Sequence, residues 1–261
     1  RGLLNGLSEE NLKILSKEEL FSLEPNVNEG AILALYAKDS AIVSPYLVTL
    51  SFMENAVDNG STLFLNSQVH SIEKMGDIFE IYTSRDVIKS KIVVNAAGLY
   101  ADSICQMVGG RKFSILPRMG EYFLLDKKCS HLASHTIFQT PDLMGKGILL
   151  TPTVDGNILA GPSAVDIFDK ENTQTTREGQ EFVFERACKS LPSLPKRNII
   201  NSFSGIRSIA MNEDGSPVND FIIEEDSSIQ NFVNVAGICS PGLSAAPAIG
   251  EYVSSIVLRI L

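Results

Sequence analysis

Two segments of this chain share one design, an apolar strand that ends in small residues and passes directly into a helix. One is VVNAAGLYAD, residues 93–102, and the other is VAGICSPGLSAAP, residues 235–247. Small residues let a ligand come close to the backbone, and the start of a helix offers amides to a phosphate. A single turn of this kind is as typical of a plain connection as of a binding site. Two in one chain favour a phosphate-bearing ligand such as a dinucleotide.

Hydrophobic periodicity predicts a mixture of helices and short strands. Ser16 stands three residues before Glu19, which is a capping-box pattern, and Ser240 or Ser244 could cap the last helix. Asp155-Gly156 between two apolar runs predicts a hairpin. The expected helices cover residues 12–23, 45–59, 100–108, 179–190 and 243–261. The expected strands cover residues 31–36, 62–65, 69–73, 78–83, 91–95, 121–125, 147–151, 157–161, 199–206, 221–224 and 232–236. Strand–helix units on both sides of an antiparallel middle predict two interleaved domains.

Composition limits the kinds of protein this chain can be. The 261 residues are 44% hydrophobic and 20% charged, which is ordinary for one or two globular domains. The net charge of −9 argues against nucleic acid as a partner, although a few arginines can still hold a small anion in a cleft. Apolar runs such as residues 148–150 are far shorter than the ~20 residues of a membrane span. We therefore expect a cytoplasmic globular protein with no transmembrane segment.

Cysteine and histidine spacing gives no sign of a metal centre or of hydrolase chemistry. Free thiols are favoured over disulfides, because no CxxC occurs. The cysteines are Cys105, Cys129, Cys188 and Cys239. His70, His131 and His135 have no metal-ligand spacing, which favours surface histidines over a metal site. No GxSxG elbow is present either.

Three basic residues are candidates for holding an anion: Arg118, Lys146 and Arg207. Arg207 follows the extended run FSGI, where a guanidinium can grip a carboxylate or a phosphate with two parallel hydrogen bonds. Lys146 lies between Gly145 and Gly147, which suits a ligand loop and a plain turn equally. For each of the three, a solvated surface cation is the alternative.

Five ordered segments resemble the D-amino-acid oxidase superfamily of flavoproteins. They read VVNAAGLYADSI, RMGEYFLLD, GKGILLTPTVDGNILAGPSA, FSGIRS and VAGICSPGLSAAPAIGEYV, and they spread from Val93 to Val253. Within the superfamily the chain is most similar to the glycerol-3-phosphate dehydrogenase and L-2-hydroxyglutarate oxidase branch. The opening, residues 5–46, also matches, so the resemblance covers essentially the whole chain.

The resemblance implies an FAD-dependent oxidoreductase that acts on the CH–OH carbon of a small anionic substrate, with an unidentified electron acceptor. An amine-oxidising relative and a flavin-free binding module on the same fold are the alternatives. The resemblance assigns the substrate anion to Arg207, with Lys146 and Tyr122 as weaker candidates. It assigns the adenosine-pyrophosphate side of FAD to Val69, Ala96, Ala97 and Gly98. It assigns the ribityl chain and ring edge to Gly237, Gly242, Leu243 and Ser244.

The chain also departs from the family pattern. No GxGxxG occurs in the 261 residues, although the family holds the FAD pyrophosphate on such a turn. None of the histidines lies in the family's histidine motif, so the catalytic base stays unassigned. We expect a fragment that is inactive alone and binds FAD weakly or not at all. The expected fold is mixed α+β and α/β: an antiparallel-sheet substrate domain (1–45 and 113–201) interleaved with the remnant of a Rossmann-like FAD-binding domain (46–112 and 202–261).

Overall fold

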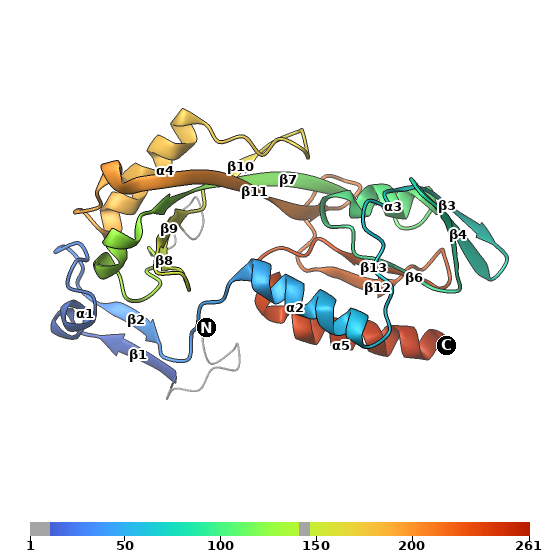
Figure 1. Cartoon of the computed structure of the whole chain (residues 1–261), viewed down its shortest axis with the longest axis horizontal. Helices are drawn as coiled ribbons and strands as arrows, with labels where there is room; N and C mark the ends of the chain where they lie inside the picture. The colour runs from blue at the N-terminus through green and yellow to red at the C-terminus, as the bar shows by residue number, and fades with distance from the viewer. Residues whose placement is uncertain (1–10, 141–146) are drawn as a thin grey trace. The chain divides into compact units, whose positions relative to one another are not determined.

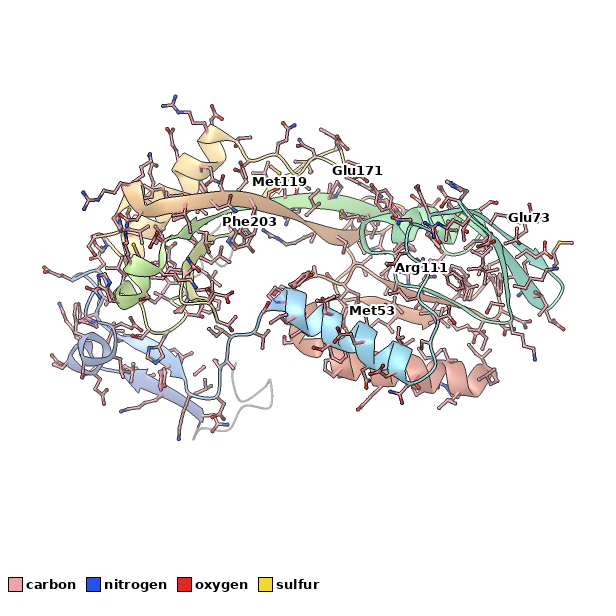
Figure 2. The ribbon with its side chains drawn as sticks, viewed as in Figure 1. Met53, Glu73, Arg111, Met119, Glu171 and Phe203 are labelled. Carbon is pink, nitrogen blue, oxygen red and sulfur yellow. The ribbon has the colours of Figure 1, made fainter. Side chains whose placement is uncertain are left out.

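A computed structural model describes residues 11–140 and 147–261 (Figure 1). The architecture is mixed α/β with antiparallel sheets, as the sequence predicted. The chain alternates between two compact units. Unit 1 comprises Arg1–Phe52, Gly120–Ala164 and Thr173–Gly205, and unit 2 comprises Met53–Met119, Val165–Asn172 and Ile206–Leu261. The assignment of the chain to a substrate domain and an FAD-binding domain stays a prediction. Figure 2 labels Phe203 in unit 1 and Met119 in unit 2.

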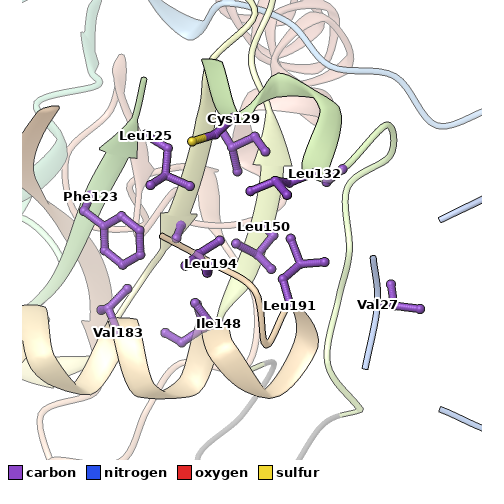
Figure 3. Packing of buried hydrophobic residues seen from close by; sticks show 14 of the residues in the cluster. Val27, Phe123, Leu125, Cys129, Leu132, Ile148, Leu150, Val183, Leu191 and Leu194 are labelled. Atoms are coloured by element: carbon purple, nitrogen blue, oxygen red, sulfur yellow. The ribbon is translucent and has the colours of Figure 1, made fainter. Parts of the chain in front are cut away.

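Unit 1 is an antiparallel sheet covered by a helix. β8 (Leu149–Pro152) and β9 (Ile158–Gly161) form the predicted hairpin, and β9 pairs with the last residues of β7 (Ser114–Leu125). The helix α4 (Arg177–Ser190) lies on this sheet. Val183 on α4 and Phe123 on β7 are both fully buried, and Figure 3 shows them in one cluster with Leu150. Burial of such side chains is the main source of stability in a unit of this kind.

A small β-sheet and a short helix complete unit 1. β1 (Leu12–Leu15) pairs with β2 (Ala34–Ala37) in an antiparallel register, and α1 (Lys17–Leu23) follows β1 directly. The prediction of one helix over residues 12–23 is therefore wrong in its first turn. The reason is the capping box itself: the Glu19 amide donates to Ser16 Oγ and the Ser16 amide donates to Glu19 Oε2, so the helix begins at Lys17. The short 3-10 helices are Lys127–Leu132 and Lys196–Asn198.

Unit 2 contains two three-stranded sheets. In the first, β12 (Ile222–Glu225) lies antiparallel to β13 (Phe232–Ala236), which lies parallel to β6 (Val93–Asn95). The second is the antiparallel sheet of β3 (Val69–Met75), β4 (Ile78–Thr83) and β5 (Val87–Ser90). The 3-10 turn Gly98–Tyr100 leads into α3 (Ala101–Met107), which packs between the sheets through the buried Cys105. All five residues of β13 are buried, which makes it the centre of the unit.

The remaining elements border these sheets. α5 (Gly242–Ile260) packs on β13 through Ile256, and β10 (Val165–Asp166) pairs with β7. β11 (Ile199–Met211) also pairs with β7, and α2 (Pro45–Asp58) has no buried residue. Among the residues that the structure describes, no helix is both long and apolar enough to span a bilayer.

Residues 62–65 and Val87–Ser90 are two places at which the structure differs from the strand predictions. Residues 62–65 are not a strand, and Leu63, Phe64 and Leu65 are instead exposed in an irregular segment. An apolar run needs a partner strand to become a ladder, and none pairs with this segment within the described ranges. β5 was not predicted, because its four residues VIKS carry too short an alternation to stand out.

Candidate functional site

The two glycine turns lie at one edge of a sheet in unit 2. β6 and β13 are parallel, with Asn95 opposite Asn234, so their carboxyl ends point the same way. Each strand leads into a left-handed glycine, with φ of +56° at Gly98 and +68° at Gly237. Only glycine adopts this conformation without strain. The parallel pairing therefore joins turns whose strands are 139 residues apart in the chain.

A buried polar network fixes the spacing of the two turns. Asn95 donates from Nδ2 to the Ala101 carbonyl at 2.8 Å and to Asn234 Oδ1 at 3.0 Å. Asn234 in turn donates to Asp226 Oδ2 at 3.2 Å, which also accepts from the Arg111 amide at 2.7 Å. Asn95, Asn234 and Asp226 are at most 3% exposed. The sequence analysis missed this network, although the signal was present as one asparagine in each of two otherwise apolar strands.

The second turn is braced by β11. A Cβ on Gly237 would lie 2.7 Å from the Cβ of Ala210, closer than real side chains approach. Two residues earlier on β11, the Ser208 hydroxyl donates to the Ile238 carbonyl at 3.3 Å. The half of β11 that belongs to unit 2 is thus packed directly against the turn that opens α5.

The predicted ring-edge residues Gly242, Leu243 and Ser244 lie together in the first turn of α5. The prediction of a serine cap is wrong: the N-cap is Pro241, no side chain caps the helix, and Ser244 Oγ instead donates to the Pro241 carbonyl at 2.9 Å. Because no side-chain acceptor covers this 19-residue helix at its start, its positive end is available to a ligand. Leu243 is 47% exposed at the same place.

Three of the four residues predicted for the adenosine-pyrophosphate side line one pocket of unit 2. The pocket has a volume of about 300 Å³ and is mostly apolar. Its walls include Phe64, Val69, Ile81, Val93, Ala96 and Ala97. Gly98 follows, and no described atom lies within 4 Å of where its Cβ would stand. An apolar pocket beside an open glycine turn suits a flat ring joined to a phosphate.

Arg207 belongs to a charged group beside the second turn. Arg118 faces Asp166 across the β7–β10 pair and binds it with two hydrogen bonds, Nε to Oδ1 at 2.5 Å and Nη2 to Oδ2 at 3.1 Å. This fork lowers the pKa of Asp166, and the nearby charge of Arg207 lowers it further. Asp166 also raises the pKa of Arg118, to which the Cys239 side chain adds a smaller contribution. The sequence singled out both arginines and missed Asp166.

The two weaker candidates for substrate binding are Tyr122 and Lys146. Tyr122 belongs to unit 1, where its ring stacks on Phe203 with 5.3 Å between centroids, while Arg207 belongs to unit 2. Gly161 makes room for the Tyr122 ring, since a Cβ there would lie 2.5 Å from Tyr122 Cδ1. Lys146 lies outside the described residues. The roles assigned to all three substrate candidates stay predictions.

The histidines and cysteines form no metal cluster in the described ranges. His70 and His131 are exposed, as expected, while His135 is half-buried, with its Nδ1 2.6 Å from Glu24 Oε1. All four cysteines are free. Burial raises the pKa of Cys105 to about 11, so this thiol is unreactive near neutral pH.

Unit 2 thus offers much of what a flavin dinucleotide requires. The apolar pocket, the open turn at Gly98 and the uncapped start of α5 fit the ring and phosphate parts of such a ligand. The sequence contains no GxGxxG turn, which would supply a further site for the pyrophosphate.

Comparison with known proteins agrees with this geometry. Residues 3–256 match the family described as FAD dependent oxidoreductase. A glycerol 3-phosphate dehydrogenase from Caloramator mitchellensis is 46% identical over 260 residues, which are 100% of this chain and 52% of that protein. The chain therefore spans about half the length of that relative. An L-2-hydroxyglutarate dehydrogenase from Indibacter alkaliphilus is 27% identical and is matched over 99% of this chain and 72% of its own length.

A solved structure shows the same fold. The dithionite-reduced L-α-glycerophosphate oxidase from Mycoplasma pneumoniae, with FAD bound, superposes with a TM-score of 0.91 and 31% identity. The superposition covers 98% of this chain and 67% of the other. The family match over nearly the whole length, together with this likeness in fold, shows that the chain belongs to the family of FAD-dependent oxidoreductases.

Proposed function

We propose that this chain forms part of an FAD-dependent dehydrogenase or oxidase that removes a hydride from the CH–OH carbon of a small anionic substrate. Glycerol 3-phosphate is the first candidate, because the relative with 46% identity is named for it. A 2-hydroxy acid such as L-2-hydroxyglutarate is the second. The observation that carries the proposal is the parallel pairing of β6 with β13, which brings two glycine turns to one sheet edge, with the strand of Arg207 packed on the second turn.

FAD, when bound, supplies the hydride acceptor. The chain's own residues bind FAD and the substrate and orient them relative to each other. The apolar pocket at Val69 takes the adenosine end, and the turn from Ala96 to Gly98 takes a phosphate. The start of α5 at Gly242 places its positive end near developing negative charge. Arg207 holds the substrate anion with a guanidinium fork.

We also propose that tight binding of FAD requires a further strand–turn–helix unit beside β6. Among the residues that the structure describes, β6 is the last strand of its sheet, and Val94 on it is 41% exposed. An exposed apolar edge of a parallel sheet is ordinarily covered. The purified chain should therefore show little flavin absorbance. A chimera that adds the part of the Caloramator relative that this chain does not match should carry stoichiometric FAD. Stoichiometric flavin on the unmodified chain would overturn this part of the proposal.

The reaction is tested by anaerobic flavin bleaching in the flavin-loaded protein. Glycerol 3-phosphate, L-2-hydroxyglutarate, glycine and L-proline form the substrate panel. Bleaching by a hydroxy compound supports the proposal, and the faster of the first two identifies the substrate. Bleaching by an amino acid alone would make this an amine-oxidising relative. A stoichiometric flavin that no compound bleaches would make it a binding module.

We place the protein in a reducing compartment, the cytoplasm. The supporting observation is that Cys105, Cys129, Cys188 and Cys239 are all free thiols. The electron acceptor is not assigned. Comparing the rates at which oxygen and a quinone or dye reoxidise the bleached flavin distinguishes an oxidase from a dehydrogenase.

A further inference from the structure

The buried polar network behind the two glycine turns has a fixed direction. It ends at Asp226, which follows β12 directly and is 3% exposed. Both carboxylate oxygens accept backbone amides: Oδ2 accepts from Arg111 at 2.7 Å, and Oδ1 accepts from Ser228 and Ile229 at 2.9 and 3.2 Å. Because a carboxylate only accepts hydrogen bonds, Asn234 must turn its Nδ2 towards Asp226.

This direction passes from one strand to the next. Since Asn234 Nδ2 faces the carboxylate, Asn234 Oδ1 faces β6 and accepts from Asn95 Nδ2 at 3.0 Å. Asn95 in turn directs its own Oδ1 towards the first turn, where it accepts from the Ala97 amide at 3.4 Å. The two asparagines are directly opposite each other in the β6–β13 pair. One buried carboxylate thus determines how two side-chain amides are oriented, as far as the backbone of the first turn.

The two asparagines also occupy equivalent places relative to their turns. Asn95 precedes Gly98 by three residues, and Asn234 precedes Gly237 by three residues. The strands are parallel, so both chains leave the sheet in the same direction after this contact. Asn95 and Asn234 are only 2% and 0% exposed. Breaking their bond is unfavourable at such a place, because no water replaces the lost partner.

We propose that Asp226, Asn234 and Asn95 are positioning residues for FAD, which hold the two glycine turns at the one separation at which both ends of a single FAD molecule bind. The inference rests on the proposed function, which places the adenosine end of FAD at the first turn and its ring edge at the second. The three side chains act through the backbone of the turns. A ligand with two ends binds more tightly than its separate halves only where both sites are held at a matching span. The network supplies this fixed span.

Asn234→Leu removes the bond between the strands and leaves other contacts of each turn in place. Leucine has nearly the shape of asparagine, Asn95 keeps the Ala101 carbonyl as an acceptor, and Asp226 keeps its backbone amides. Each half of FAD should therefore still bind its own turn, whereas intact FAD should lose the advantage of binding both turns at once. Asp226→Asn should act in the same direction, because an amide at this position places its NH2 group against backbone donors in either orientation.

Asn157 in unit 1 provides a matched control. It is 8% exposed, and its Nδ2 donates to the Leu125 carbonyl on β7 at 2.8 Å, so it too makes a buried amide contact with a strand. Asn157→Leu should lower the melting temperature, as Asn234→Leu does, but should leave the binding of FAD and of its halves unchanged. The comparison separates a loss of stability from a loss of positioning.

The test uses the FAD-carrying chimera after its flavin has been removed. Absorbance titration gives the Kd of FAD and of riboflavin, and displacement of FAD gives the Kd of ADP. We expect Asn234→Leu and Asp226→Asn to raise the Kd of FAD about tenfold or more, while the Kd values of ADP and riboflavin change by less than about threefold. If only one half binds tightly enough to titrate, that half gives the comparison.

The possible failures are distinct. If the unsubstituted chimera binds no FAD, the proposed function fails and the inference fails with it. If the chimera binds FAD but Asn234→Leu leaves the Kd of FAD within about twofold, the function stands and the positioning role is wrong. If the Kd of FAD rises only in proportion to that of ADP or riboflavin, the network supports the fold of a single turn rather than the separation of the two, and the inference is overturned.

Discussion

The carboxylate of Glu121 occupies the space that a side chain on Gly179 would need. Glu121 is 1% exposed and lies under the first turn of α4, where it accepts hydrogen bonds from the Thr176 amide and hydroxyl at 2.9 and 2.8 Å. A Cβ built on Gly179 overlaps both oxygens of this carboxylate. The helix and the buried charge fit each other only because residue 179 has no side chain.

Gly179→Ala should therefore destabilise unit 1. Alanine is worth about 1 kcal/mol over glycine within a helix, but here it must displace a buried carboxylate from its donors. Such losses cost on the order of 2–4 kcal/mol. The melting temperature should fall by several degrees. The matched control is Gly250→Ala in α5, where nothing described lies within 4 Å of the added Cβ and the melting temperature should hold or rise. Equal behaviour of the two variants would contradict the packing described for Glu121.

Gly237→Ala should disturb the second turn and loosen flavin binding. The substitution forces alanine into a backbone with φ +68° and brings its Cβ to 2.7 Å from that of Ala210. The left-handed conformation alone costs roughly 1–2 kcal/mol. Flavin affinity, measured by absorbance titration of the FAD-carrying chimera, should fall at least tenfold.

Two further variants separate strain from collision at this turn. Gly215→Ala has a similar φ of +79° with nothing described within 4 Å, so it should lower stability without changing flavin affinity. Adding Ala210→Gly to Gly237→Ala removes the colliding methyl group and should restore part of the affinity. No recovery would mean that backbone strain, rather than β11, sets the position of the turn.

Arg207→Ala should weaken substrate binding much more than flavin binding. Losing a guanidinium–anion pair in a cleft costs on the order of 2–5 kcal/mol. That corresponds to roughly thirtyfold or more in kcat/KM. Arg207→Lys should rescue little, because an ammonium cannot reproduce the planar fork. A folded, flavin-loaded Arg207→Ala variant with unchanged kcat/KM would remove this residue from the site.

The buried thiol of Cys105 predicts a loss of stability at alkaline pH. Burial raises its pKa from 9.0 to about 11, so the folded chain keeps a proton that the unfolded chain releases. The stabilisation is complete below pH 9 and is lost as pH rises towards 11, with a total of about 1–3 kcal/mol. Urea unfolding at pH 8 and pH 10.5 should show this decrease. Cys105→Ala should reduce the pH dependence, and an unchanged slope would assign it to other groups.

The sequence predicted those elements whose local signals agree with their tertiary surroundings. Ile78–Thr83 and Phe232–Ala236 were predicted residue for residue, because an apolar run bounded by turn residues matches a buried strand. Residues 12–15 were misassigned because a capping box and a preceding short strand share one apolar pattern. The four residues of β1 form a strand because they pair with β2, and their own sequence does not indicate that pairing.

The sequence predicted the glycines of the candidate site but not the carboxylate that pairs with one of its arginines. Gly98 and Gly237 stood out because few residues tolerate their backbone. Asp166 did not, because a lone aspartate in a two-residue strand looks like any surface carboxylate. Its pairing with Arg118 exists only through the β7–β10 register. Neither strand contains information about the other.

The hydrogen bond between Asn95 and Asn234 has a consequence for engineering. One contact of 3.0 Å, buried between two parallel strands, sets the separation of the two loops that follow them. Because the contact lies in the strands, a substitution at either amide should disturb the positions of both loops. A designer who transplants the loops from a relative must therefore transfer the two asparagines together with them, and must keep the left-handed glycines Gly98 and Gly237 inside the loops.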